Sequence, residues 1–118
     1  MLIRSQNKMS LVKFENIVVN INNINGKEII CWSQMNPGED EYISLGHYST
    51  KAKAMKVLDM IQEAYEEYKI ACTFLTGFTG HRAIVESNDI RMNGYKELIK
   101  SFKKNMVFQM PEDSEVEA

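Results

Sequence analysis

Short apolar runs separated by polar turns fill the first 48 residues of the chain. The runs lie at residues 1–5, 11–15, 16–23, 27–33 and 41–48, and the third is rich in β-branched side chains, which favour strands. Asn25-Gly26, between the third and fourth runs, predicts a tight turn because both residue types tolerate a positive φ. Since parallel pairing needs long crossovers, this pattern predicts an antiparallel meander.

A helical periodicity replaces this pattern after residue 48. Ser49 or Thr50 can cap the helix, and residues 51–69 contain no Gly or Pro. Apolar side chains then recur at a 4-3-4-3 spacing that places them on one stripe: Ala54, Leu58, Ile61, Tyr65 and Tyr68. Met55, Val57 and Met60 widen the apolar surface. The helix therefore packs on one sheet, and its surplus apolar surface leaves open a contact with a second copy of the chain.

The last third of the chain predicts three further elements. Residues 71–76 are typical of a strand, residues 94–104 of a second, shorter helix, and residues 107–110 of a final strand that Pro111 ends. We therefore predict an α+β fold in a single domain over residues 1–111. It contains an antiparallel β-sheet (the N-terminal meander), one long helix, a shorter second helix and a C-terminal strand.

Charge is unevenly distributed along the 118 residues. The chain has 14 Lys+Arg and 16 Asp+Glu; residues 112–118 hold four acids and no base, so residues 1–111 hold 12 acids and 14 bases. We predict that residues 112–118 form a flexible, solvated acidic tail, with an arm that docks on a basic partner as the alternative. The basic excess lies at residues 51–56 and 82–104, which leaves room for a small anionic ligand. The overall charge makes nucleic acid an unlikely general partner.

Several classes of protein find no support in the sequence. No apolar run approaches the roughly 18 residues that span a membrane, and the start of the chain has no signal-peptide pattern. His47, His81, Cys31 and Cys72 lack the spacing of metal ligands, and the two cysteines are typical of reduced core residues in a cytoplasmic protein. No motif places a nucleophile beside a base. We predict a binding protein in the cytoplasm, with no catalytic residue, metal or cofactor.

Residues 75–110 carry the side chains that a nucleotide site uses. An aromatic ring stacks on a base, Arg binds a phosphate, and a side-chain amide reads base edges or ribose hydroxyls. This segment holds four aromatics, four cations and four side-chain amides: Phe78, Tyr95, Phe102 and Phe108; Arg82, Arg91, Lys103 and Lys104; and Asn88, Asn93, Asn105 and Gln109. Phe78 stands in a predicted glycine-flanked turn, where a ligand contact or an interface competes with packing in the core.

Three stretches together resemble small proteins carried by phages and prophages of low-GC Gram-positive bacteria. They are Leu2-Ile-Arg-Ser-Gln6, the block from Tyr42 to Ile61 with its Leu-Gly-His-Tyr-Ser-Thr junction, and Val107-Phe-Gln-Met-Pro-Glu-Asp113. Within that group the chain looks most like the Thoeris anti-defence sponge family. The resemblance implies an antiparallel sheet with helices, a dimer or dimer-based homo-oligomer, and sequestration of a cyclic nucleotide signal such as a cyclic ADP-ribose isomer without its degradation.

The resemblance also implies ligand-binding residues. Phe78 and Asn88 match the family's aromatic and amide by type and order, Arg82 or Arg91 would bind phosphate, and Lys53 would add a second anion site between subunits. Two alternatives stay open. The acidic clusters favour a phage inhibitor that binds a host defence protein directly, such as a nuclease, and the basic clusters favour a small nucleic-acid-binding or regulatory module.

Overall fold

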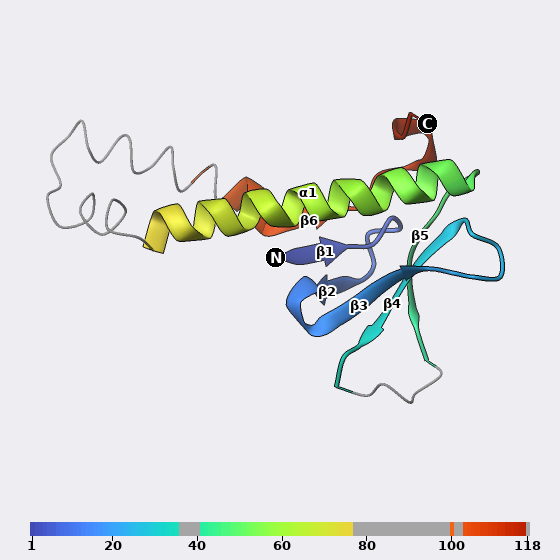
Figure 1. Cartoon of the computed structure of the whole chain (residues 1–118), viewed down its shortest axis with the longest axis horizontal. Coiled ribbons are helices and arrows are strands. Elements are labelled where there is room, and N and C mark those ends of the chain that lie inside the picture. The colour runs from blue at the N-terminus through green and yellow to red at the C-terminus, as the bar shows by residue number, and fades with distance from the viewer. Residues whose placement is uncertain (36–40, 77–99, 101–102, 118) are drawn as a thin grey trace, which may run out of the picture.

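A computed structural model describes residues 1–35, 41–76, 100 and 103–117 of the chain (Figure 1). The elements in chain order are β1 (Leu2–Arg4), β2 (Leu11–Lys13), the 3₁₀ turn η1 (Phe14–Asn16), β3 (Ile17–Ile21), β4 (Glu28–Ser33), β5 (Ile43–His47), α1 (Lys51–Thr76), β6 (Val107–Gln109) and the 3₁₀ turn η2 (Asp113–Glu115). Residue 100 and residues 103–106 are also helical. The predicted α+β fold, with its long helix, shorter helix and C-terminal strand, is confirmed.

The strands form two three-stranded sheets, with the orders β2-β1-β6 and β3-β4-β5. The predicted antiparallel pairing is confirmed between β1 and β2 and throughout the second sheet. β6 instead runs parallel to β1, with Ile3 opposite Phe108. The physical reason is that β6 returns to β1 only after α1, and so long a connection permits the crossover that a parallel pair needs.

The turn between β3 and β4 lies where the sequence predicted it, although Gly26 alone of the Asn25-Gly26 pair adopts a positive φ. Gly26 adopts a φ of +68°, and its backbone N–H donates to the Asn22 carbonyl oxygen at 2.8 Å. The Asn25 side-chain oxygen accepts from the Lys27 backbone N–H at 2.9 Å, which fixes the start of the returning strand. This local chemistry explains why the hairpin could be located from sequence.

α1 is longer than predicted, because residues 71–76 continue the helix instead of forming a strand. No Gly or Pro lies between Lys51 and Gly77, so the backbone has no local reason to leave the helix before residue 77. The Thr73 hydroxyl donates to the Lys69 carbonyl oxygen at 2.9 Å, which accommodates a β-branched residue that disfavours helix by itself. The β propensity of this short segment was outweighed by its continuity with a long helix.

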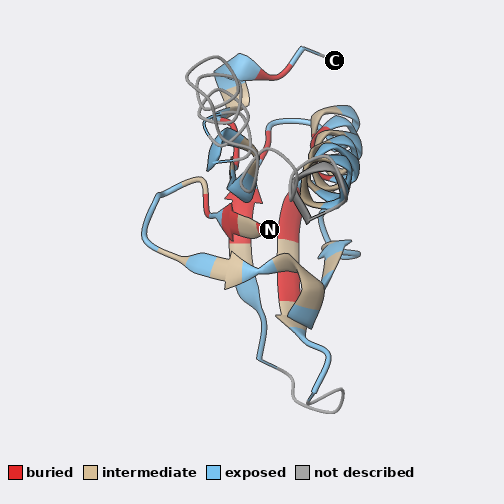
Figure 2. Cartoon of the chain, turned by 90° about the vertical axis from the view of Figure 1, so that its left-hand side faces the viewer, coloured by how far each residue is buried: buried red, intermediate tan, exposed pale blue. Residues whose placement is uncertain are grey.

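The core lies between α1 and the two sheets, where Figure 2 shows the buried residues at the centre of the molecule. On α1, Ala54, Val57 and Ile61 are buried; the predicted stripe positions Leu58, Tyr65 and Tyr68 are half-buried. The fully buried strand residues are Ile3, Ile29, Cys31 and Leu45. The Phe14 and Tyr65 ring centroids lie 4.6 Å apart and hold η1 against the helix.

Residues 112–117 pack on the domain, whereas the sequence predicted a flexible, solvated tail. Val116 is only 4% exposed and belongs to the core. Glu112 and Glu115 form a capping box around η2, with the Glu112 backbone N–H donating to Glu115 Oε1 at 3.0 Å. The acidic composition of the segment led to the prediction of a solvated tail. Burial of the apolar Val116 side chain is the physical reason why the segment packs on the domain instead.

Candidate functional site

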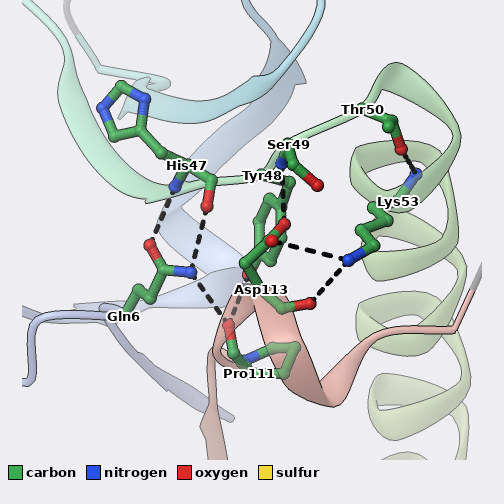
Figure 3. Close-up of polar contacts among 8 residues, drawn as sticks. All are labelled: Gln6, His47, Tyr48, Ser49, Thr50, Lys53, Pro111 and Asp113. Atoms are coloured by element: carbon green, nitrogen blue, oxygen red, sulfur yellow. Dashed lines mark hydrogen bonds and ion pairs between the residues drawn. The ribbon is translucent and has the colours of Figure 1, made fainter.

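A polar junction joins the two sheets, the start of α1 and the C-terminal segment (Figure 3). Gln6 is its centre. Its Nε2 donates to the carbonyl oxygens of His47 and Pro111, both at 3.1 Å, and its Oε1 accepts from the His47 backbone N–H at 2.9 Å. The side chain thereby occupies the edge of β5 as a neighbouring strand would, and ties that edge to the loop after β1.

The buried Tyr48 side chain is also part of this junction. Its hydroxyl donates to the Pro111 carbonyl oxygen at 2.9 Å, and burial raises the pKa of this phenol, so it stays a donor. A Cβ on Gly46 would lie 3.2 Å from the Tyr48 Oη and 3.3 Å from the Gln6 Cβ. Glycine at position 46 therefore allows the close approach of both side chains.

The first turn of α1 receives a carboxylate from the C-terminal segment. Asp113 Oδ1 accepts from the Ser49 backbone N–H at 2.7 Å, and Thr50 Oγ1 accepts from the Lys53 backbone N–H at 3.1 Å, as predicted for a cap. Lys53 Nζ donates to the Asp113 carbonyl oxygen at 3.0 Å and lies 3.4 Å from Oδ2. The Ser49 hydrogen bond, followed by the charge of Lys53, holds the pKa of Asp113 below its usual value of 3.8.

These contacts bear on Lys53 as a candidate anion ligand. Its ammonium is already engaged within the chain, and only 20% of the side chain is exposed. The role of Lys53 between subunits stays a prediction, and an anion bound there would compete with the Asp113 carboxylate.

The depressed pKa of Asp113 predicts a pH dependence of stability. The stabilisation is fully present above the pKa of the unfolded state, near 3.8, and is lost as the pH falls through the lower folded pKa. Asp113→Asn keeps an oxygen acceptor for Ser49 but removes the titrating charge. We expect chemical unfolding from pH 7 to pH 2 to show a smaller acid-dependent loss in Asp113→Asn than in the unmodified chain. Parallel curves would contradict this assignment.

A pocket of about 300 Å³ lies between α1 and residues 104–108, which belong to the end of the second helix and to β6. We call it the Phe108 pocket; it is lined by Met60, Glu63, Ala64, Glu67, Lys104, Asn105, Val107 and Phe108. Lys104 and Val107 are exposed, whereas Asn105 and Phe108 are half-buried. The pocket therefore offers an aromatic ring, an amide, one cation and two carboxylates to a small molecule.

The sequence indicated the residues on one side of this pocket but not those on the other side. Lys104, Asn105 and Phe108 belong to the segment whose composition suggested a nucleotide. The α1 wall gave no signal because Glu63 and Glu67 belong to an acidic helix face of ordinary appearance. The remaining predicted ligand residues lie outside the described residues: Phe78, Arg82, Asn88, Arg91 and Asn93.

Reactive groups are few in the part of the chain that the structure describes. No three His, Cys, Asp or Glu side chains in that part are placed to hold a metal ion. Burial raises the pKa of the Cys31 thiol to about 11, so it is protonated and poorly nucleophilic at neutral pH. His47 Nε2 lies 2.9 Å from Glu28 Oε2, a contact between two adjacent strands. Of the described helices, none is both long and apolar enough to cross a bilayer.

Known proteins offer no guide to this site. No family model, no curated protein and no solved structure matches the chain. Its function must therefore be argued from the residues.

Proposed function

We propose that the protein binds and sequesters a cyclic nucleotide immune signal, and that it acts as a phage anti-defence protein in the cytoplasm of an infected bacterium. The ligand is a cyclic ADP-ribose isomer or a cyclic oligonucleotide, and it is held without being degraded. The observation that carries the proposal is the Phe108 pocket, where an aromatic ring, an amide and a cation converge from a segment already notable for nucleotide chemistry.

The size of the Phe108 pocket suits one nucleoside unit. Its volume of about 300 Å³ stands at the lower end of the range for small-molecule sites, roughly 300–1,000 Å³. A base can stack on the Phe108 ring while Asn105 pairs with its edge. The rest of a cyclic dinucleotide would extend beyond this pocket.

The charges in the pocket suggest how such a ligand is oriented. Glu63 and Glu67 accept hydrogen bonds but repel phosphate, so they suit ribose hydroxyls or an exocyclic amine. Lys104 is the cation on the opposite wall and suits a phosphate. The sequence-predicted Arg82 and Arg91 would bind the other phosphate of the ligand. The protein would assemble as a homo-oligomer.

A panel of ligands tests the proposal. The protein is heated with cyclic ADP-ribose isomers and with cyclic oligonucleotides, and the ligand released after denaturation is identified by chromatography. A ligand present at 100 times its dissociation constant adds about 2.7 kcal/mol to the free energy of unfolding, which raises the melting temperature by several degrees. A shift with intact ligand supports sequestration, a shift with altered ligand supports an enzyme, and the absence of any shift contradicts the proposal.

Two neighbouring lysines provide a matched pair of variants. Lys104→Glu places a third carboxylate in the pocket, and we expect it to weaken nucleotide binding by about tenfold or more, since a charge-assisted bond contributes roughly 1.5–3 kcal/mol. Lys103→Glu makes the same charge change at an exposed residue outside the pocket lining. It should alter affinity less than about twofold. Equal losses in both variants, measured by titration calorimetry, would show that only overall charge matters.

A further inference from the structure

A second hollow lies along the first half of α1 and is also lined by Glu117 of the C-terminal segment. Figure 1 shows the C-terminus near this first half of α1. The volume of the hollow is about 540 Å³, and we call it the Met55 groove; it is lined by Ala52, Met55, Lys56, Asp59, Met60, Glu63 and Glu117. The α1 residues from position 52 to position 63 recur every three or four residues, so they form one strip of three turns, about 16 Å long.

Carboxylates from two distant parts of the chain converge on this groove. Asp59 and Glu63 come from α1, Glu117 comes from the C-terminal segment, and Lys56 is the single cation among the lining residues. Within the described residues, the ion pairs are those of the N-terminus with Glu15, His47 with Glu28, and Lys53 with Asp113, so none of them neutralises the three carboxylates. The lining therefore carries two negative charges in excess.

The floor of the groove is apolar and adaptable. Met55 is 51% exposed although it lies on a packed helix, and Met60 beside it is half-buried. Methionine side chains are flexible and polarizable, so they fit the irregular apolar face of a partner. Burial of Met55 against another surface removes apolar area from water, which favours association.

We propose that the Met55 groove docks a basic amphipathic helix of a partner protein. The helix places apolar side chains over Met55 and Met60, and its Lys or Arg residues face Asp59, Glu63 and Glu117. Charge complementarity selects this occupant, because an anionic ligand or an acidic segment would be repelled by the lining. The proposal does not rest on nucleotide binding, and the groove shares Met60 and Glu63 with the Phe108 pocket.

Defined peptides test the proposal without knowledge of the natural partner. The probe is a fluorescent Leu/Lys peptide of about 15 residues, or four turns, with leucines at helical spacing. A Leu/Glu peptide with the same leucine positions and a Leu/Lys peptide with alternating leucines are the controls. We expect anisotropy titrations to show binding of the first peptide only, weakening by about tenfold from low salt to 0.5 M salt.

Two charge reversals on α1 locate the binding site. Asp59→Lys changes the groove, whereas Glu66→Lys changes a different face of the helix, beside Phe14 and Tyr65. We expect Asp59→Lys to weaken binding of the Leu/Lys helix about tenfold and Glu66→Lys to change it less than about twofold. Equal effects of the two variants, binding of the Leu/Glu peptide, or no binding at all would overturn the proposal. Circular dichroism of both variants is the control for folding.

Discussion

Removal of residues 112–118 is expected to lower the free energy of unfolding by about 2 kcal/mol or more. Burial of a valine side chain such as Val116 contributes roughly 1.5–3 kcal/mol by itself. The truncation also removes Asp113, which caps the Ser49 backbone N–H and contacts Lys53. Both losses act on the packing of the C-terminal segment against the start of α1.

Urea unfolding of two truncated chains measures this effect. A chain that ends after Pro111 lacks the whole segment, whereas a chain that ends after Val116 keeps the buried residue and the Asp113 contacts. We expect the shorter chain to unfold at a clearly lower urea concentration and the longer one to match the full chain within about 0.5 kcal/mol. If the shorter chain matches the full chain as well, the segment is a solvated tail after all.

Replacement of Ile3 by alanine is expected to cost about 2–5 kcal/mol, the range for deleting a large buried aliphatic side chain. Ile3 is fully buried on the central strand of its sheet, between β2 and β6. The cavity would open in the layer that joins this sheet to α1, where neighbouring side chains cannot collapse freely.

Leu11→Ala on the adjacent strand is the matched control. Leu11 is 56% exposed, so its replacement should change stability by less than about 0.5 kcal/mol. Thermal and urea unfolding of both variants give the comparison. Similar costs for Ile3→Ala and Leu11→Ala would contradict the assignment of the core to the side of the sheet where Ile3 lies.

The features predicted correctly from the sequence are those that local chemistry determines. The β3–β4 hairpin follows from Asn25 and Gly26, whose conformations depend on near neighbours, and α1 follows from an unbroken apolar periodicity. Ala54 and Ile61 are buried because their spacing places them on the face turned toward the sheets.

The features missed depend on segments far apart in the chain. The parallel pairing of β6 with β1 joins residues more than 100 positions apart, and nothing in either strand encodes its direction. The same holds for Gln6, whose side chain links β5 to Pro111. The burial of Val116 depends on a surface that the rest of the fold supplies, so composition alone marked its segment as solvated.

The candidate site was predictable only in part. Lys104, Asn105 and Phe108 belong to a segment whose composition suits a nucleotide, but the opposing wall of the Phe108 pocket comes from the acidic face of α1. Charge along the sequence likewise suggested a basic cluster at residues 51–56. The structure instead joins Lys53 to Asp113 and places Lys56 in the lining of one groove with three carboxylates. Local charge in a folded chain depends on which distant residues meet.

The most direct test of the proposed function is calorimetric titration of the full chain with each cyclic ADP-ribose isomer and cyclic oligonucleotide, followed by chromatography of the recovered ligand. We predict saturable binding of at least one of these nucleotides, recovery of that ligand unchanged, and weaker binding in Lys104→Glu than in Lys103→Glu. Absence of binding for every nucleotide, or recovery of a converted product, would contradict sequestration.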